Sequence, residues 1–464
     1  MFQINPESVA RPTPDLTERR SAILAGQTHA SAEIEACLAR AADPAVAPAF
    51  LRLDAAAARE TARAVDAALA HGAPLPPLAG LAVSVKDLFD VAGQTTAAAS
   101  RILRDAPPAA QDAPAVARLR AAGAALVGRT HMTEFAFSGV GLNPHHPTPA
   151  NVPMATLDPA TPRIPGGSSS GAATSVAGGA CWAALGSDTG GSLRIPAALQ
   201  GLVGFKGTAA RVPTAGAVPL STTLDTAGAI TRSVRDAILL HELLAARRVE
   251  QPGRPLSATR FALPTTLMLD ALEPAVAAAF DRALAALSSA GARIESIALA
   301  PLEELGPLTV HGGFSAAESW AWHRHRLAER EPDYDARVAL RIRRGAAMSA
   351  ADYLDLQAAR RDWIARMQAA LRGFDALLSP TVPLVAPPVA ALEASDEEFF
   401  RVNALLLRNP SVVNLLDGCA ISLPCQPPGA APVGLMLWQA REHDGALLDT
   451  ALAVESALAA EPRA

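Results

Sequence analysis

The spacing of apolar and polar positions predicts an α/β protein, in which helices alternate with short buried strands. Between residues 15 and 70 the spacing is helical. Ala, Leu and Val recur on one face of Asp54–Leu69 while arginines lie on the other, and Ser31 is placed to cap a helix at Ala32–Arg40. A proline-rich stretch then ends this pattern. Leu81–Val85 follows as a short, valine-rich run, which predicts a buried strand.

The rest of the chain continues this alternation without internal repeats and without a clear linker between independent domains. Residues 142–165 are rich in proline and asparagine and predict an irregular loop. Gly171–Gly186 predicts a buried helix that is too short to span a bilayer. The other predicted helices are Ala113–Ala122, 233–250, 273–290, helical structure within Ser315–Leu371, and Gly445–Leu458; the other predicted strands are Ala124–Gly128, Arg260–Leu263, Ala376–Ser379 and Ala420–Leu423.

Composition narrows the class of protein. Half of the 464 residues are hydrophobic and 18% are charged, which excludes general disorder. A net charge of −5 and a pI of about 6.1 provide no basic surface for nucleic acid, so no nucleic-acid partner is expected. Residues 1–15 show no secretory signal, and nothing indicates a membrane partner. The chain has four cysteines but no CxxC pair and no His/Cys cluster, so we expect no bound metal. We expect no other cofactor either, and a cytoplasmic enzyme.

Lysine usage is unusual. Lys and Arg total 40, yet Lys86 and Lys206 are the only lysines. Codon bias toward arginine explains the imbalance, but it also draws attention to the two exceptions. Arginine supplies charge but does not readily lose its proton, whereas a desolvated lysine can act as a base. Each lysine is therefore a candidate for a specific role.

Two segments rich in glycine and serine, Gly166–Gly171 and Gly186–Ser192, concentrate the candidate chemistry. A serine nucleophile needs a base and N–H donors for the developing oxyanion, and glycines before Ser192 would expose such donors. Either segment alone is more typical of a simple turn. The first also fits G-x-S-x-G around Ser169, but the prolines before it rule out the strand that an α/β-hydrolase elbow requires, and no downstream histidine is suggestive.

Together these segments resemble the amidase signature family of hydrolases. The resemblance rests on Pro165–Gly171, Leu185–Ala198 and Gly201–Lys206, with support from Val83–Asp87, Gly128–Phe135, Leu224–Gly228 and Ala420–Cys425. It covers about 75–250 and 375–455. Ser170, Ala172 and Gly207 depart from the usual pattern, so the substrate subgroup stays open.

The resemblance implies one large α/β/α domain over residues 1–464, with a central mixed β-sheet covered by helices. Its parts would be an N-terminal helical part (1–72), a catalytic core (75–250), a variable helical region and candidate lid (255–370), and a C-terminal part of the core (375–464). Phe137, Trp320 and Trp322 are expected to line an apolar substrate pocket.

The resemblance also implies residue roles. Ser192 would be the nucleophile, Ser168 the bridging serine after a cis peptide bond, and Lys86 the base. Burial at a strand end without a carboxylate in contact would keep Lys86 neutral, since Asp87 would point to the opposite face. The roles of the neighbouring residues would be an oxyanion hole of N–H groups from Thr189, Gly190, Gly191 and Ser192, loop-fixing by Asp188 and Arg194, hydrogen-bond support by Ser169 and Ser170, and a scaffold role for Lys206.

Two functions compete. The first is a stand-alone amidase that hydrolyses carboxamides or anilides, and for which esters and carbamates (urethanes) are also plausible substrates. A homodimer is a candidate assembly for it. The alternative is the glutamine-hydrolysing subunit of a tRNA-dependent amidotransferase, which the shared motifs do not exclude. A catalytically inactive binding protein is disfavoured because all three reacting residues are present.

Overall fold

The computed structural model describes residues 14–460, so most of the segment examined for a secretory signal lies outside the described residues. The α-helices are α1 (Leu16–Leu24), α2 (Ala30–Ala41), α3 (Ala55–Ala70), α4 (Pro114–Ala121), α5 (Val152–Leu157), α6 (Ser170–Ala177), α7 (Arg194–Leu199), α8 (Val234–Ala245), α9 (Pro274–Ser289), α10 (Gly306–Thr309), α11 (Gly313–Arg330), α12 (Ala336–Arg343), α13 (Ala350–Ala370), α14 (Val389–Ala394), α15 (Asp396–Leu415) and α16 (Asp444–Ala460). The strands are β1 (Phe50–Leu53), β2 (Ala82–Lys86), β3 (Ala125–Thr130), β4 (Ala183–Asp188), β5 (Val203–Lys206), β6 (Thr226–Thr231), β7 (Arg260–Pro264), β8 (Arg293–Ile297), β9 (Ala376–Pro380), β10 (Cys419–Pro424) and β11 (Gly434–Gln439).

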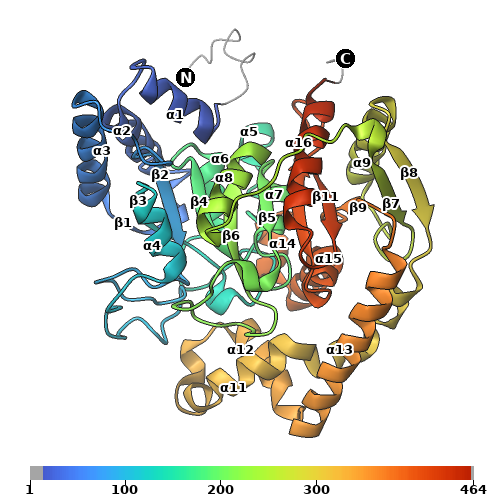
Figure 1. Cartoon of the computed structure of the whole chain (residues 1–464). Coiled ribbons are helices and arrows are strands. Elements are labelled where there is room, and N and C mark those ends of the chain that lie inside the picture. The colour runs from blue at the N-terminus through green and yellow to red at the C-terminus, as the bar shows by residue number, and fades with distance from the viewer. Residues whose placement is uncertain (1–13, 461–464) are drawn as a thin grey trace.

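The strands of the described chain form one mixed sheet of 11 strands, in the order β1-β3-β2-β4-β6-β5-β10-β11-β9-β7-β8. Strand β2 runs parallel to β3 and β4, and β7 runs parallel to β8 and β9. The other neighbouring pairs are antiparallel. The sheet extends from β1 and β3 on one side of the molecule to β7 and β8 on the other (Figure 1). The predicted single α/β domain with a mixed sheet is confirmed.

Helices cover both faces of this sheet, as successive residues of β11 show. Leu435 and Leu437 pack in a hydrophobic cluster with residues of α8, α9 and α16. Met436 and Trp438 pack in a different cluster, which includes residues of α13 and α15. Because alternate side chains of a strand point to opposite faces, the two clusters lie on opposite sides of the sheet.

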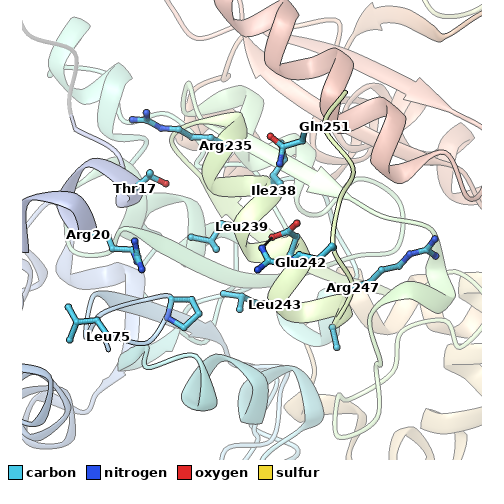
Figure 2. A pocket seen from close by; sticks show the side chains of 13 residues that line it. Thr17, Arg20, Leu75, Arg235, Ile238, Leu239, Glu242, Leu243, Arg247 and Gln251 are labelled. Atoms are coloured by element: carbon cyan, nitrogen blue, oxygen red, sulfur yellow. Dashed lines mark hydrogen bonds and ion pairs between the residues drawn. The ribbon is translucent and has the colours of Figure 1, made fainter. Parts of the chain in front are cut away.

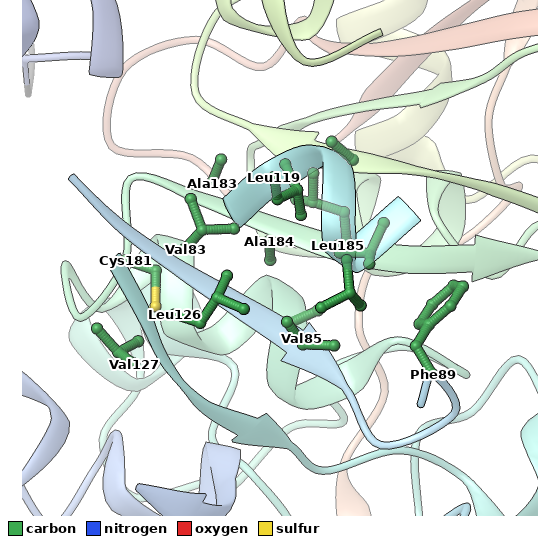
Figure 3. Packing of buried hydrophobic residues seen from close by; sticks show 14 of the residues in the cluster. Val83, Val85, Phe89, Leu119, Leu126, Val127, Cys181, Ala183, Ala184 and Leu185 are labelled. Carbon is green, nitrogen blue, oxygen red and sulfur yellow. The ribbon is translucent and has the colours of Figure 1, made fainter. Parts of the chain in front are cut away.

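The strands that carry the candidate chemistry are anchored in the largest hydrophobic cluster. Val83 and Val85 of β2 pack there with Leu126 of β3 and Leu185 of β4 (Figure 3). Full burial of such a side chain contributes about 1.5–3 kcal/mol. All residues of β2, β3 and β4 are buried, as expected for strands covered on both faces. This packing holds the ends of β2 and β4 in fixed positions.

Two local predictions are wrong. The predicted helix over Gly171–Gly186 ends at Ala177, and Ala183–Asp188 forms the buried strand β4. Gly179 has a φ of +78°, a conformation that favours glycine and ends the helix. A continuous run of small and apolar residues does not distinguish a buried helix from a buried strand. At α2, Ser31 is not the cap, because the N–H groups of Ala30 and Ser31 donate to the Asp66 carboxylate.

The structure also contains elements that the sequence pattern did not predict. The segment 142–165 contains the short helix α5, and the part described as helical before residue 70 contains β1. Within 255–370, β7 and β8 join the central sheet beside β9, and α13 packs in a hydrophobic cluster with residues of β7, β9 and β11, so this region is not wholly separate from the sheet (Figure 1). Among the described residues, no helix combines the length and apolarity needed to cross a membrane.

Candidate active site

Lys86 is the last residue of β2 and is fully buried. Its Nζ atom lies 2.8 Å from Oγ of Ser168 and 2.8 Å from Oγ of Ser187. Within residues 14–460 it forms no ion pair with a carboxylate. Burial lowers the pKa of Lys86 to about 7, although Asp188 and Asp225 attract its charge from a distance. A substantial fraction of Lys86 is therefore neutral near pH 7.

Asp87, the residue after Lys86, points away from this site. Its Oδ1 atom accepts a hydrogen bond from Nε of Arg129 at 2.6 Å, and its Oδ2 atom accepts one from the Ala99 N–H. The pair is buried. Asp87 therefore neutralises Arg129 rather than Lys86, in agreement with the alternation along the strand.

Ser168 follows a cis peptide bond with Gly167, as the family resemblance implied. The residue is fully buried, and its carbonyl accepts a hydrogen bond from the Thr133 N–H at 3.2 Å. The loop is thus fixed by the backbone that follows β3, while the Ser168 hydroxyl faces Lys86.

Ser187 was missed by the sequence analysis, although it lies within the Gly186–Ser192 segment. Strands β2 and β4 are parallel neighbours, with Val85 opposite Leu185, so Lys86 and Ser187 meet at the same edge of the sheet. A signal was present in principle, because alternation along β4 places Ser187 and Asp188 on opposite faces. It could be used only once β4 was known to neighbour β2.

Ser192 lies in the turn between β4 and α7. Its hydroxyl makes no hydrogen bond to any described residue, and the side chain lines a cavity of about 220 Å³. Gly191 before it has a φ of +129°, and a Cβ atom there would lie 2.6 Å from Cβ of Pro410. Glycine is therefore required for the backbone to pass α15 and turn Ser192 toward the cavity.

The N–H groups of this turn divide into two sets. Those of Thr189, Gly190 and Ser192 have no hydrogen-bond acceptor among the described residues, and all three residues line the cavity. The Gly191 N–H instead donates to Oδ1 of Asp188 at 2.8 Å. The expectation that Gly191 contributes a free donor is therefore corrected, because the carboxylate at the end of β4 caps the turn.

Asp188 and Arg194 form a buried ion pair that holds the same turn. Nε and Nη2 of Arg194 donate to the two carboxylate oxygens of Asp188, at 3.0 and 2.9 Å. Asn414 of α15 donates to the carboxylate and accepts from Arg194. Burial would raise the pKa of Asp188, but Arg194 outweighs it and the pKa falls to about 2. The expected loop-fixing interaction is present, and Asn414 is an additional member.

Asp225 is a second carboxylate that the sequence analysis did not assign to the site. It accepts a hydrogen bond from the Thr189 hydroxyl at 2.5 Å and bonds from the N–H groups of Leu220 and Ser221. Burial raises its pKa to about 6. It connects the turn of Thr189 to the segment before β6, within the Leu224–Gly228 motif.

Ser169 and Ser170 support the neighbouring backbone. The Ser169 hydroxyl donates to the Ser187 carbonyl at 3.3 Å, and its N–H donates to the Ser192 carbonyl at 3.3 Å. The Ser170 hydroxyl lies 2.8 Å from Nδ1 of His131, a buried ring that follows β3. Burial lowers the pKa of His131 to about 3, so the ring is neutral at pH 7.

Lys206 lies in β5 and forms no part of this arrangement. Its Nζ atom donates to the carbonyls of Gly207 and Gly418, at 2.9 and 2.6 Å. Burial lowers its pKa to about 8. Its hydrogen bonds within the described chain go to backbone carbonyls and not to a serine, which agrees with the scaffold role expected for this residue.

The cavity beside Ser192 has a different lining from the predicted pocket. Phe137 lines it as expected, but Trp320 and Trp322 do not. Trp322 instead packs against Phe135 and lies under the Arg326 guanidinium, because only the first turn of α11 reaches the cavity. The remaining lining residues are Ala136, Ser138, Thr189, Gly190, Leu220, Leu224, Leu308, Thr309, Gly312, Gly313, Phe314, Ser315, Ala316, Arg341, Arg344, Leu407, Ser411 and Leu415.

A larger hollow of about 670 Å³ lies between α1, α8 and the segment around Leu75 (Figure 2). None of the residues singled out by the sequence lines it. Its Arg235 is engaged by Asp15 and Glu18, and its Arg248 by Glu242. In the described chain, no group of three or more His, Cys, Asp or Glu side chains is arranged to hold a metal ion.

Comparisons with known proteins agree on a family. The model of the family named Amidase matches residues 32–448. A 2-amino-5-chloromuconic acid deaminase from Comamonas testosteroni is 38% identical over 417 residues, 88% of each chain. A glutamyl-tRNA(Gln) amidotransferase subunit from Salinispora arenicola is 34% identical over 96% of this chain and 98% of its own. A crystal structure of an amidase, 36% identical, superposes with a TM-score of 0.85 over 96% of this chain and 99% of that one.

Proposed function

Because this chain belongs to the amidase family and is an amide-hydrolysing enzyme, we propose that it cleaves linear carboxamides or anilides through an acyl-enzyme on Ser192. The observation that carries the proposal is the position of a buried lysine, free of any ion pair with a described residue, 2.8 Å from Ser168. Esters and carbamates are included, because the same acyl-enzyme chemistry accommodates them.

The proposed reaction begins with proton transfer. Neutral Lys86 accepts the proton of the Ser168 hydroxyl, while Ser168 accepts the proton of Ser192. Oγ of Ser192 then attacks the amide carbon, and the carbonyl oxygen becomes an oxyanion. The N–H groups of Thr189, Gly190 and Ser192 are its proposed donors, since these residues line the cavity and their N–H groups have no other acceptor in the described chain.

Breakdown of this intermediate releases the amine and leaves the acyl group on Ser192. Ser168 returns a proton to the departing nitrogen and regains one from Lys86. Water then attacks the acyl-enzyme, and the same relay removes the proton of the water and restores the Ser192 hydroxyl. Ser187 contacts Lys86 at 2.8 Å and is proposed to hold its amine toward Ser168.

The substrate class is tested by offering the purified chain an anilide, a primary aryl amide, an aryl carbamate and glutamine. We expect turnover of at least one of the first three by the chain alone. Hydrolysis of glutamine only, and only when partner proteins are added, would instead support the amidotransferase function.

The pH dependence follows from the pKa of Lys86. We expect kcat/KM for an uncharged amide to fall about tenfold per unit as the pH drops below about 7, and to level off above it. The sign follows from the role of Lys86 as a base, which is lost when it binds a proton. A rate that continued to rise up to pH 10 would show that the base has the ordinary pKa of a lysine, and would contradict the lowered pKa of Lys86.

Ser169→Ala is expected to reduce kcat about tenfold without abolishing turnover, because its hydroxyl supports the Ser187 carbonyl and does not contact Lys86. The measurement is steady-state hydrolysis of the best substrate. Ser456→Ala on the exposed face of α16 is the control and should match the unaltered protein. Complete loss of activity in Ser169→Ala would show that the relay has been assigned to the wrong serine, because Ser168 would still be present.

A further inference from the structure

The cavity beside Ser192 carries positive charge without a matching negative charge. Arg341 and Arg344 are its charged lining residues, and none of the described Asp or Glu residues lines it. The other lining side chains are apolar or uncharged. An anionic group on the substrate would supply the missing counter-charge.

Arg341, in the last turn of α12, is held in place without being neutralised. Its Nη1 atom donates to the carbonyl of Phe137, and its guanidinium carbon lies 4.4 Å from the centre of the Phe137 ring. It forms no ion pair within residues 14–460. Burial lowers its pKa to about 10, and the charge of Arg344 acts in the same direction, whereas the Asp335 carboxylate acts in the opposite direction without forming an ion pair with Arg341. The guanidinium remains charged at neutral pH, with donors left over for a ligand.

Arg341 is half-buried, and two fully buried arginines provide a contrast. Arg129 is paired with Asp87, and Arg194 is paired with Asp188. Uncompensated charge in a protein interior is costly, and buried charges are normally paired. Arg341 has no such carboxylate partner among the described residues, and it borders the nucleophile's cavity.

The three arginines Arg341, Arg343 and Arg344 near the end of α12 also differ in whether a carboxylate pairs with them. Arg343 is directed outward and forms an ion pair with Glu331. Arg344 is an exposed residue that lines the cavity and makes no hydrogen bond or ion pair with a described residue. The chain thus neutralises the arginine outside the cavity and leaves Arg341 and Arg344, at its wall, without carboxylate partners in the described part of the chain.

We propose that the amide cleaved at Ser192 carries a carboxylate, and that Arg341, assisted by Arg344, binds this carboxylate. This inference rests on the proposed function and narrows its substrate class to compact carboxylate-bearing amides. A guanidinium offers two parallel N–H donors that match the two oxygens of a carboxylate. A cavity of about 220 Å³ limits the substrate to a small molecule. Apolar side chains line much of this cavity, but its wall carries two arginines and not the two predicted tryptophans.

The experiment compares matched substrates. Succinamate, glutaramate and adipamate each carry an amide and a carboxylate, and butyramide, valeramide and hexanamide are their uncharged counterparts. We expect at least one acid amide to exceed its counterpart in kcat/KM by about 100-fold, chiefly through a lower KM. Arg341→Met should remove most of this preference, and Arg341→Lys should restore part of it.

Arg344→Met, which removes no hydrogen bond within the described chain, should reduce the preference by a smaller factor and is the variant least prone to misfolding. Arg343→Met is the control, because its side chain lies outside the cavity and should leave the preference unchanged. Equal rates for acid and neutral amides, or an unaltered preference in both Arg341→Met and Arg344→Met, would overturn the inference.

A binding measurement separates this inference from the proposed function. Glutarate, titrated calorimetrically into the unaltered protein, should bind and should bind at least tenfold more weakly to Arg341→Met. If no amide is hydrolysed but glutarate binds in this way, the proposed reaction fails while the carboxylate site stands. If amides are hydrolysed and glutarate does not bind, the reaction stands and the carboxylate site is wrong.

Discussion

Replacing Lys86 with methionine is expected to lower kcat by about 10⁴-fold at pH 8 while the protein remains folded. The side chain of methionine has a similar length but has no nitrogen to accept the proton of Ser168. The contacts at 2.8 Å to Ser168 and Ser187 are the polar interactions that this change removes. The measurement is hydrolysis of the best substrate, with thermal unfolding followed in parallel.

Stability provides the control for this variant. The pKa of Lys86 is about 7 in the folded protein, below the value near 10.4 of an unfolded chain. Between these values the unfolded state binds more protons, so the stability contributed by this residue rises with pH from about 7 to 10. The methionine variant should lose this rise and should be no less stable at pH 7. Full activity in the variant would exclude Lys86 as the base.

Some features around Lys86 could be anticipated from local sequence, whereas its contact with Ser168 was implied only by the family resemblance. Apolar residues before Lys86 predicted a buried strand end, and alternation placed Asp87 on the other face, where it meets Arg129. Glycines predicted an exposed turn at Ser192, which the structure places beside the cavity. The catalytic roles of these residues remain predictions.

Other parts of the site depend on contacts between distant segments. Gly191 was expected to donate to substrate, but its N–H donates to Asp188, which Asn414 and Arg194 also hold. Asn414 is more than 200 positions from Asp188, and no local pattern relates the two. Strand β4 was hidden inside a predicted helix, so the contact of Ser187 with Lys86 was not predicted.

The residues that line the cavity could not be predicted from local sequence either. Trp320 and Trp322 were chosen as bulky residues in a variable region, but helix α11 presents its first turn to the cavity instead. Arg341 reaches the same cavity from α12, and its proximity to Phe137 joins segments 204 positions apart. Which side chains of the region 255–370 meet a substrate is therefore determined by tertiary packing.

Replacing Ser192 with alanine is expected to reduce kcat by roughly 10⁴-fold or more, because the attacking oxygen itself is removed. The Ser192 hydroxyl makes no hydrogen bond within the described chain, so its loss should leave the fold and ligand affinity nearly unchanged. The measurements are steady-state hydrolysis and calorimetric binding of a product acid. Retention of binding with loss of turnover would show that the hydroxyl acts in the reaction and not in recognition.

Ser411→Ala is the matched comparison for this change. Ser411 lines the same cavity, and its hydroxyl donates to the Arg408 carbonyl at 3.4 Å, so its removal should cost less than tenfold in kcat. The unaltered enzyme, quenched with acid during turnover of an anilide, should carry the mass of one acyl group on the peptide that contains Ser192. That mass should be absent from Ser192→Ala and present in Ser411→Ala. An acyl group attached to Ser168 instead would reverse the assignment of nucleophile and bridging serine, while leaving Lys86 as the base.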